Sequence, residues 1–233
     1  MSNQRQLYET VYQYDDIQLF HDYERNRLLA RIANKIFGFG RGGGIRCLDI
    51  GCNDGVVASF LKTEFDVQMT CLDISERALI LAKKRGLTEL ILANVEGTLP
   101  FQESAFEVVF WGDNVEHLFN PLTTLKEIHR ITKRNGVLLV STPNMGWIVN
   151  RLYYLIKGIP RRTEGHRNPP WMWEHIRFFN KAAIKEFLES GGFQLVGFWS
   201  CDRRPFFDWL SGAFPQLCGS IMLAAARKIS DQE

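Results

Sequence analysis

The chain has 233 residues, of which 45% are hydrophobic and 23% are charged, and its formal net charge is +2 at pH 7. This composition is typical of a globular protein and leaves room for one large α/β domain. The basic clusters are short and scattered, so the charge pattern requires no nucleic-acid partner. The five cysteines include no C-x-x-C pair, and no signal segment or membrane-spanning run is visible. We therefore expect a reducing, cytoplasmic setting.

Residues 1–44 are expected to form an N-terminal helical segment that ends in a glycine-rich joint. Apolar residues recur at helical spacing between Asp15 and Phe37. The following "GFGRGGG" contains the pattern G-x-G-x-x-G, but it precedes a predicted strand. A phosphate-binding loop instead follows a strand and opens a helix. We therefore interpret the glycines as a flexible joint and residues 45–233 as the main domain.

After the joint, β-rich runs alternate with helical ones. Strands are predicted at 45–51, 67–74, 89–95, 106–112, 136–143, 193–200 and 218–228, and helices at 56–62, 75–85, 121–131 and 181–190. Strands separated by helices indicate a doubly wound, mostly parallel sheet, here with seven strands and a Rossmann-like arrangement. The last two strands are joined without a helical pattern, so one of them is expected to be antiparallel.

The stretch "CLDIGCNDG", residues 47–55, ends the first strand where a ligand lies in an open α/β sheet. Gly51 permits a sharp turn, and Gly55 permits close approach of the next helix to a ligand and the strand. Asn53 stands where such loops often have a third glycine. Because Asn tolerates the left-handed backbone better than most residues, the loop is expected to keep its shape.

The charges around this loop favour one class of ligand. Asp49 and Asp54 would repel a pyrophosphate, and no Lys or Arg is expected near them. The pocket therefore suits a cationic amine or sulfonium. Asp73 ends the second strand, where an acid accepts hydrogen bonds from ribose hydroxyls. Asn94, in "ANVEG" after the third strand, is placed to address an adenine edge.

Adenine, ribose and a cationic amino acid together describe S-adenosylmethionine. The chain resembles the class I S-adenosylmethionine-dependent methyltransferases, specifically the small-molecule branch related to ubiquinone-biosynthesis methyltransferases. The resemblance runs from about residue 45 to 193 through "LDIGCNDG", "CLDIS", "ANVEGTLPF", "FEVVFWGDNVEHLFNP", "GVLLVSTPN" and "EHIRFFNKAAIKEFLESGGF". It implies that the first loop holds the methionine part, the acid of the second strand the ribose, and the residues after the third strand the adenine.

The cofactor set expected from the loops and the resemblance comprises Asp49, Gly51, Cys52, Asn53, Gly55, Asp73, Ile74, Asn94, Val95, Glu96 and Trp111. Two positions depart from the family pattern. Asn53 replaces a glycine, and Asn94 stands where an Asp often binds the adenine amine. S-adenosylhomocysteine is the expected product of the cofactor.

The acceptor side is expected in the irregular segment 144–179. "WIVNRLYYLIKG", residues 147–158, has helical spacing, and two interpretations stay open: a helix packed on the sheet edge, or a lid over an apolar acceptor or at a membrane surface. Aromatic residues flanked by glycines suit either a lid that closes when both ligands are bound or a permanently packed flap. His117 and His175 are the candidate general bases, and Arg177 could hold an acidic acceptor.

The expected reaction is methyl transfer to a small-molecule acceptor, apolar, lipid-like or sugar, with O-methylation favoured. Two alternatives remain. One is a module that binds the cofactor without catalysis. The other is a methyltransferase for nucleic-acid or protein amines, suggested by "NPPW" at residues 168–171, although that signature should end the fourth strand. His21, His129 and His166 show no ligand spacing, so no metal site is expected.

Overall fold

The computed structural model describes residues 25–26, 28–29, 32, 44–163 and 175–229. Its elements are, in chain order, β1 Arg46–Ile50, α3 Val56–Phe65, β2 Gln68–Asp73, α4 Glu76–Lys84, β3 Glu89–Leu92, β4 Phe106–Gly112, η1 Val115–His117, α5 Pro121–Ile131, β5 Thr132–Pro143, α6 Ile148–Lys157, α7 Lys181–Ser190, β6 Phe193–Cys201, α8 Pro205–Ser211 and β7 Ile221–Lys228. The described residues between 25 and 32 are helical, as expected. The glycines before Gly44 and the "NPPW" stretch lie outside the described residues.

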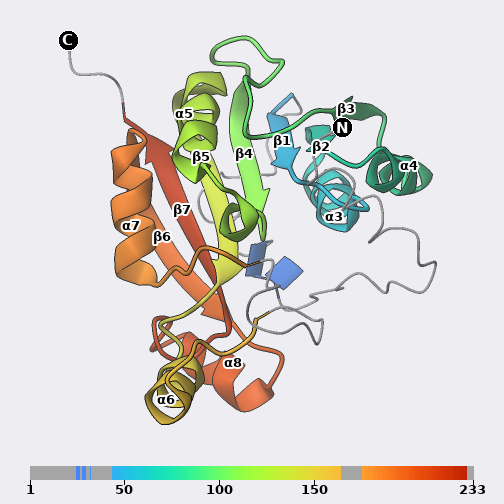
Figure 1. Cartoon of the computed structure of the whole chain (residues 1–233). Helices are drawn as coiled ribbons and strands as arrows, with labels where there is room; N and C mark the ends of the chain where they lie inside the picture. Colours follow the sequence, from blue (N-terminus) through green and yellow to red (C-terminus); the bar gives the residue numbers. More distant parts are fainter. Residues whose placement is uncertain (1–24, 27, 30–31, 33–43, 164–174, 230–233) are drawn as a thin grey trace.

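All seven strands form one sheet in the order β3-β2-β1-β4-β5-β7-β6 (Figure 1). β1 pairs in parallel with both β2 and β4, so the strand order reverses beside β1. β7 runs antiparallel to β5 and β6. The predicted doubly wound, mostly parallel sheet with one antiparallel strand is confirmed. The reversal places a ligand crevice beyond the carboxyl ends of β1 and β4.

Local signals explain where the helices begin. At α4, Ser75 Oγ accepts a hydrogen bond of 3.2 Å from the Ala78 N–H. At α7, Asn180 Oδ1 accepts one of 3.0 Å from the Ala183 N–H. Pro121 occupies the first turn of α5, where its missing N–H costs nothing. These short-range contacts confirm the helix starts predicted from the sequence.

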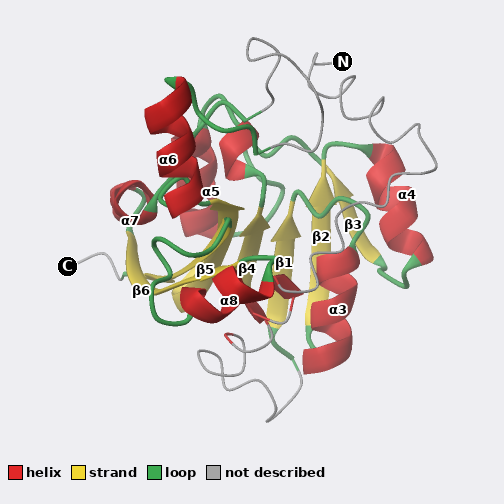
Figure 2. Ribbon diagram, turned by 90° about the horizontal axis from the view of Figure 1, so that it is seen from below, coloured by secondary structure: helices red, strands yellow, loops and turns green. Residues whose placement is uncertain are grey.

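The sheet is covered on both faces, with α3 and α8 on one side and α5 and α7 on the other (Figure 2). Successive residues of a strand point to opposite faces. Leu48 and Ile50 of β1 therefore join the apolar cluster that contains Leu125 of α5. Cys47 joins the opposite cluster with Val57 of α3. Both faces of β1 are buried, and four of its five residues, all except Arg46, are almost inaccessible to solvent.

Two expectations about the carboxyl half need correction. The link between the last two strands does contain a helix, α8, which a segment of only seven residues did not reveal as a periodic pattern. Helix α6 forms as predicted, but it does not pack its apolar side chains on the sheet edge. Leu155 and Ile156 are 79% and 74% exposed, and α6 lies beyond the end of the sheet (Figure 1). None of the described helices is both long and apolar enough to span a lipid bilayer.

Candidate active site

The loop after β1 has the conformation that its sequence predicts. Gly51, Asn53 and Gly55 all have positive φ values, of 68°, 55° and 76°. Asn53 therefore takes the left-handed backbone expected of a residue that replaces glycine. Its N–H donates a 2.9 Å hydrogen bond to Asp73 Oδ2, so the loop is fixed to the end of β2.

The two glycines of the loop are required by their neighbours as well as by their φ angles. A Cβ on Gly51 would lie 2.8 Å from Asn114 Nδ2. A Cβ on Gly55 would lie 2.5 Å from Leu87 Cδ1. Gly55 thus permits α3 to approach the turn after α4. The sequence predicted a close approach to a ligand and to the strand, but not this helix contact.

Asp54 is not a free charge in the crevice. The expectation that no basic side chain is near the loop was wrong, because Arg85 reaches it from the end of α4. Arg85 Nη2 donates to Asp54 Oδ2 at 2.5 Å, and Arg85 Nε donates to the Asp54 carbonyl at 2.9 Å. The carboxylate is therefore neutralised by a structural ion pair. The two residues are distant in the chain, so their proximity depends on the packing of α4 beside β2.

Asp49 is the carboxylate that remains available. It is 2% exposed at the end of β1, and its Oδ2 accepts no hydrogen bond in the described part of the chain. Burial raises the pKa of this carboxyl to about 7, with Arg25 opposing the shift and Asp73 and Asp54 adding to it. A cationic group bound beside Asp49 would favour its ionised form.

Asp73 lies where the sequence places it, at the carboxyl end of β2. Its Oδ1 accepts a 2.9 Å hydrogen bond from the Ser75 N–H, while its Oδ2 accepts the bond from Asn53. Each carboxylate oxygen can accept a further hydrogen bond. Ile74, the next residue, is half-buried. Asp73 therefore organises two loops and still has acceptor capacity for hydroxyl groups.

The residues after β3 are held by local hydrogen bonds. Asn94 is exposed, and its Oδ1 accepts a 3.0 Å bond from the Glu96 N–H. Val95 is buried, and its carbonyl accepts a 3.0 Å bond from Thr124 Oγ1. Glu96 Oε1 accepts a 2.6 Å bond from the Asn120 N–H at the start of α5. Of these three residues, Asn94 has the side chain most accessible to a ligand.

Two residues expected in the cofactor set have their side chains in the core. Cys52 is 5% exposed. A hydrogen bond with Cys71 and, next in size, burial raise the pKa of its thiol well above the ordinary value. Trp111 is fully buried, and its Nε1 donates a 2.8 Å bond to Asn114 Oδ1. Trp111 therefore orients Asn114, which in turn lies against Gly51.

An arginine from the N-terminal helical segment reaches the end of β4. Arg25 forms an ion pair with Asp113, whose other carboxylate oxygen accepts a 3.0 Å bond from Ser141 Oγ. The Arg25 side chain is only 11% exposed. The segment before the glycine joint thus supplies a cation to the crevice. Nothing near Arg25 in the sequence indicates this role.

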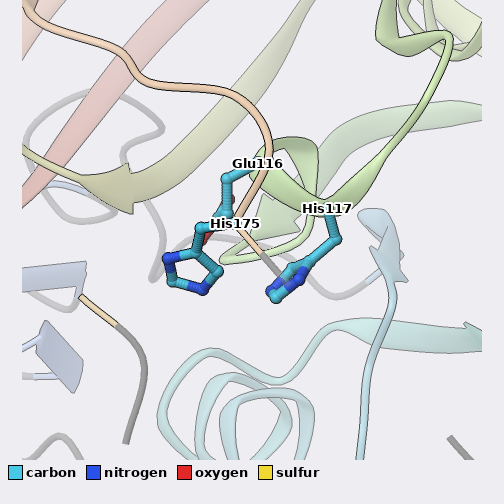
Figure 3. Close-up of side chains that lie close together, drawn as sticks. All are labelled: Glu116, His117 and His175. Atoms are coloured by element: carbon cyan, nitrogen blue, oxygen red, sulfur yellow. The ribbon is translucent and has the colours of Figure 1, made fainter. Parts of the chain in front are cut away.

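His117 and His175 lie together, with ring centroids 4.5 Å apart in an edge-to-face arrangement (Figure 3). Thr163 Oγ1 is 2.6 Å from His175 Nδ1. Burial lowers the pKa of His175 to about 4, so this imidazole is neutral near pH 7. A neutral imidazole can accept a proton, but a pKa this low makes it a weak base.

Glu116 lies beside His117 and His175, and the sequence analysis did not identify it as a site residue. It is 1% exposed, and burial raises the pKa of its carboxyl well above the usual range. Its carbonyl accepts hydrogen bonds from the N–H groups of Ile176 (2.9 Å) and Arg177 (3.0 Å). The Arg177 side chain donates to the Phe119 carbonyl at 2.7 Å, so it braces the turn after η1.

The comparison with known proteins decides the class of enzyme. Residues 48–140, which include the first loop, Asp73 and the end of β4, match the methyltransferase domain family. The chain therefore contains a methyltransferase domain, with S-adenosylmethionine as its cofactor. The methyltransferase is 29% identical over 198 residues to the demethylmenaquinone methyltransferase of Leptospira interrogans, covering 76% of this chain and 77% of that protein. It is 25% identical over 170 residues to a ubiquinone biosynthesis O-methyltransferase of Vibrio cholerae, covering 71% and 67%.

A solved structure shows the same fold. It is the 1,6-didemethyltoxoflavin-N1-methyltransferase of Burkholderia thailandensis with bound 1,6-didemethyltoxoflavin and S-adenosylhomocysteine. The TM-score is 0.66 at 16% identity, over 97% of this chain and 88% of that chain. The fold expected from the sequence is thereby confirmed, and the match to the methyltransferase domain family supports the expected cofactor.

The residues of the crevice fit S-adenosylmethionine, which supplies an electrophilic methyl group on a sulfonium sulfur. The buried Asp49 has an unpaired carboxylate oxygen beside the loop, as a cationic ligand requires. Asp73, whose carboxylate already accepts from the Asn53 N–H, lies beside the same loop. The left-handed turns at Gly51 and Asn53 form the sharp loop expected at the methionine part of the cofactor.

Proposed function

We propose that this methyltransferase modifies an oxygen of a small, apolar acceptor. The observation that carries the proposal is α6, which directly follows β5 and presents Leu155 and Ile156 at 79% and 74% exposure. Large apolar side chains that face solvent together commonly mark a surface for an apolar ligand or a membrane. The acceptor-binding region would be formed by residues 144–179, of which 144–163 and 175–179 belong to the described structure.

The names of the relatives support this acceptor class. One is a demethylmenaquinone methyltransferase and another a ubiquinone biosynthesis O-methyltransferase. Both names refer to lipid-soluble quinones, and the second names transfer to oxygen. A hydroquinone or phenol with an apolar chain is therefore the acceptor class that we propose.

In this proposal the crevice binds the cofactor by three groups of residues. The loop that contains Gly51 and Asn53 holds the methionine part, with Asp49 facing its positive charge. Asp73 accepts hydrogen bonds from the ribose, and Asn94 contacts the adenine. The enzyme contributes mainly orientation, because in-line transfer from the cofactor needs the acceptor oxygen close to the methyl carbon.

A hydroxyl acceptor must lose a proton as it is methylated. His117 and His175 lie at the carboxyl edge of the sheet, within 4.5 Å of each other by ring centroids. In the proposal they face the acceptor rather than the cofactor. The low pKa of His175 makes this imidazole a weak base on its own.

The test is methyl transfer by the purified full chain with S-adenosylmethionine and a panel of short-chain hydroquinones, phenols and primary amines. Mass spectrometry would detect the methylated product, and S-adenosylhomocysteine would be quantified in the same samples. We expect products from the hydroxyl compounds and none from the amines. Binding of S-adenosylhomocysteine without product from any compound would favour the non-catalytic module. Products from amines alone would contradict transfer to oxygen.

A further inference from the structure

A buried carboxylate and two imidazoles converge at the carboxyl edge of the sheet. One potential ligand atom from each of Glu116, His117 and His175 lies within 4.8 Å of the others. Glu116 and His117 belong to η1, shortly after β4, and His175 belongs to the irregular segment before α7 (Figure 3). This spacing is suited to one cation at the centre of the group.

The carboxylate of Glu116 is poorly satisfied by the groups around it. Glu116 is 1% exposed, and neither Oε1 nor Oε2 accepts a hydrogen bond of normal geometry within the described structure. The Thr142 hydroxyl on β5 and the Glu116 N–H lie close enough to favour the ionised carboxylate, but neither forms a well-aligned hydrogen bond with it. Buried carboxyl oxygens are almost always hydrogen-bonded or bound to a metal, because leaving them without a partner is costly. The poorly satisfied oxygens therefore indicate a ligand at this position.

The backbone around the cluster is firmly held. The N–H groups of Ile176 and Arg177 both donate to the Glu116 carbonyl, which fixes the segment of His175 against η1. A bridge between Asn144 and Phe179 attaches the same segment to the end of β5. Side chains on such a scaffold are positioned in advance, as a binding site requires.

A second interaction orients one of the imidazoles. Thr163 Oγ1 is 2.6 Å from His175 Nδ1, and a hydroxyl is a suitable acceptor for an imidazole N–H. In the tautomer that donates from Nδ1–H to Thr163, the ring lone pair is on Nε2. Histidines that bind metals typically donate their other ring N–H in this way.

We infer from this geometry that Glu116, His117 and His175 bind a divalent transition-metal ion. Two imidazoles and one carboxylate favour zinc, iron, cobalt or manganese over magnesium and calcium, which prefer oxygen ligands. Three protein ligands leave further coordination positions open. The chain shows no metal-ligand spacing in its sequence because β5 and α6 separate η1 from the segment of His175.

The position of the cluster indicates what the ion does. Asn114, immediately before η1, lies against Gly51 of the cofactor loop, so the cluster adjoins the cofactor crevice. An open coordination position there would bind the acceptor oxygen and lower the pKa of its hydroxyl, so that the proton would leave more readily during methyl transfer. This role rests on the proposed function, whereas ion binding itself does not.

The test is ion binding by the full chain after treatment with a chelator and dialysis. Manganese and zinc would be added separately, bound metal counted by mass spectrometry of the protein-bound fraction, and affinity measured by calorimetry. Cobalt would give visible absorption that reports imidazole and carboxylate ligands. We expect one ion per chain and a rise in Tm when the ion is added.

Three variants locate the site. Glu116→Gln, His117→Asn and His175→Asn should each weaken binding by about 10- to 100-fold or more. Glu64→Gln, an exposed acid on α3, is the control and should bind as the parent does. Circular dichroism would establish that each variant is folded. Because there are three variants, the test still works if one of them fails to fold. Absence of stoichiometric binding by the parent chain, or binding unchanged in all folded variants, would overturn the inference.

The outcome is distinguishable from that of the proposed function. Ion binding without methyl transfer to any hydroxyl compound would leave the metal site standing and remove the proposed acceptor. Methyl transfer that proceeds equally with and without a bound ion would keep the acceptor and remove the catalytic role of the metal. S-adenosylhomocysteine binding, measured in parallel, should not change in Glu116→Gln.

Discussion

The N–H of Asn53 donates a 2.9 Å hydrogen bond to Oδ2 of Asp73, which joins the loop after β1 to the end of β2. The same carboxylate accepts a bond from the Ser75 N–H through its other oxygen. Asp73 is thus a structural acceptor for two loops before any cofactor is bound. Its role in ribose binding, which we propose, would use the remaining lone pairs of the two oxygens.

Replacement of Asp73 should therefore affect both cofactor binding and stability. In Asp73→Ala, the loss of hydrogen bonds to a charged group should weaken binding of S-adenosylhomocysteine by roughly 1.5–3 kcal/mol, or about 10- to 150-fold in Kd. Asp73→Asn should also be impaired, because one side of the amide would present N–H groups to a backbone N–H donor. Calorimetry would give the affinities and thermal unfolding the stabilities.

Asp66→Asn is the matched control for this prediction. Asp66 is exposed after α3 and has a left-handed backbone, which Asn tolerates. This variant should keep the affinity and Tm of the parent chain. An affinity for S-adenosylhomocysteine that is unchanged in Asp73→Ala would remove Asp73 from the ribose role.

Most elements of the fold could be predicted because their signals are local. Ser75, Asn180 and Pro121 mark helix starts through contacts within one turn, and alternating apolar faces mark the strands. The loop conformation at Asn53 was predicted from the backbone preference of one residue. The missed helix α8 has only seven residues, too few for a clear apolar period.

The parts that could not be predicted depend on long-range packing. Arg85 pairs with Asp54, and Arg25 pairs with Asp113, across large separations in the chain. His117 and His175 could be assigned to the same edge of the sheet from the strand order. That both histidines lie beside Glu116 could not be predicted, because it depends on where the segment before α7 crosses η1.

The raised pKa of Asp49 should make stability depend on pH. Burial raises this pKa from 3.8 to about 7. Between these values the folded chain holds a proton that the unfolded chain has lost, so the free energy of unfolding falls as pH rises. Above about pH 7 both states are ionised and the contribution is constant. The full loss is roughly 4 kcal/mol, at 1.36 kcal/mol per pKa unit.

Asp49→Asn isolates this contribution, since an uncharged side chain of the same shape does not titrate. Urea unfolding between about pH 4 and pH 8 should show the stability of the variant rising relative to the parent chain as pH increases. Other buried acids titrate in both proteins, and their effects cancel in the difference. Stability profiles that stay parallel across the range would mean that Asp49 is not held protonated by burial.

Two glycines with similar backbones separate steric from conformational effects. Gly51 and Gly86 have φ values of 68° and 83°, but a Cβ on Gly86 would meet nothing within 4 Å. Gly86→Ala should cost about 1–2 kcal/mol of stability through the left-handed backbone alone and leave cofactor affinity intact. Gly51→Ala should add a clash with Asn114 and weaken S-adenosylhomocysteine binding by about tenfold or more, equivalent to at least about 1.4 kcal/mol. Equal affinities in the two variants would show that the contact with Asn114 is unimportant.

The exposed face of α6 leads to a prediction about lipid surfaces. Leu155 and Ile156 are 79% and 74% exposed, and Lys157 beside them carries a positive charge. Because apolar and basic side chains together favour an anionic membrane surface, we expect the chain to sediment with vesicles that contain phosphatidylglycerol. Replacing both apolar residues by Ser should reduce this binding at least about tenfold, since burying each side chain contributes roughly 1.5–3 kcal/mol.

Ile80→Ser is the control, because Ile80 is 52% exposed on α4, away from this surface. Equal sedimentation of all three proteins, or none by the parent chain, would rule out a membrane role for α6.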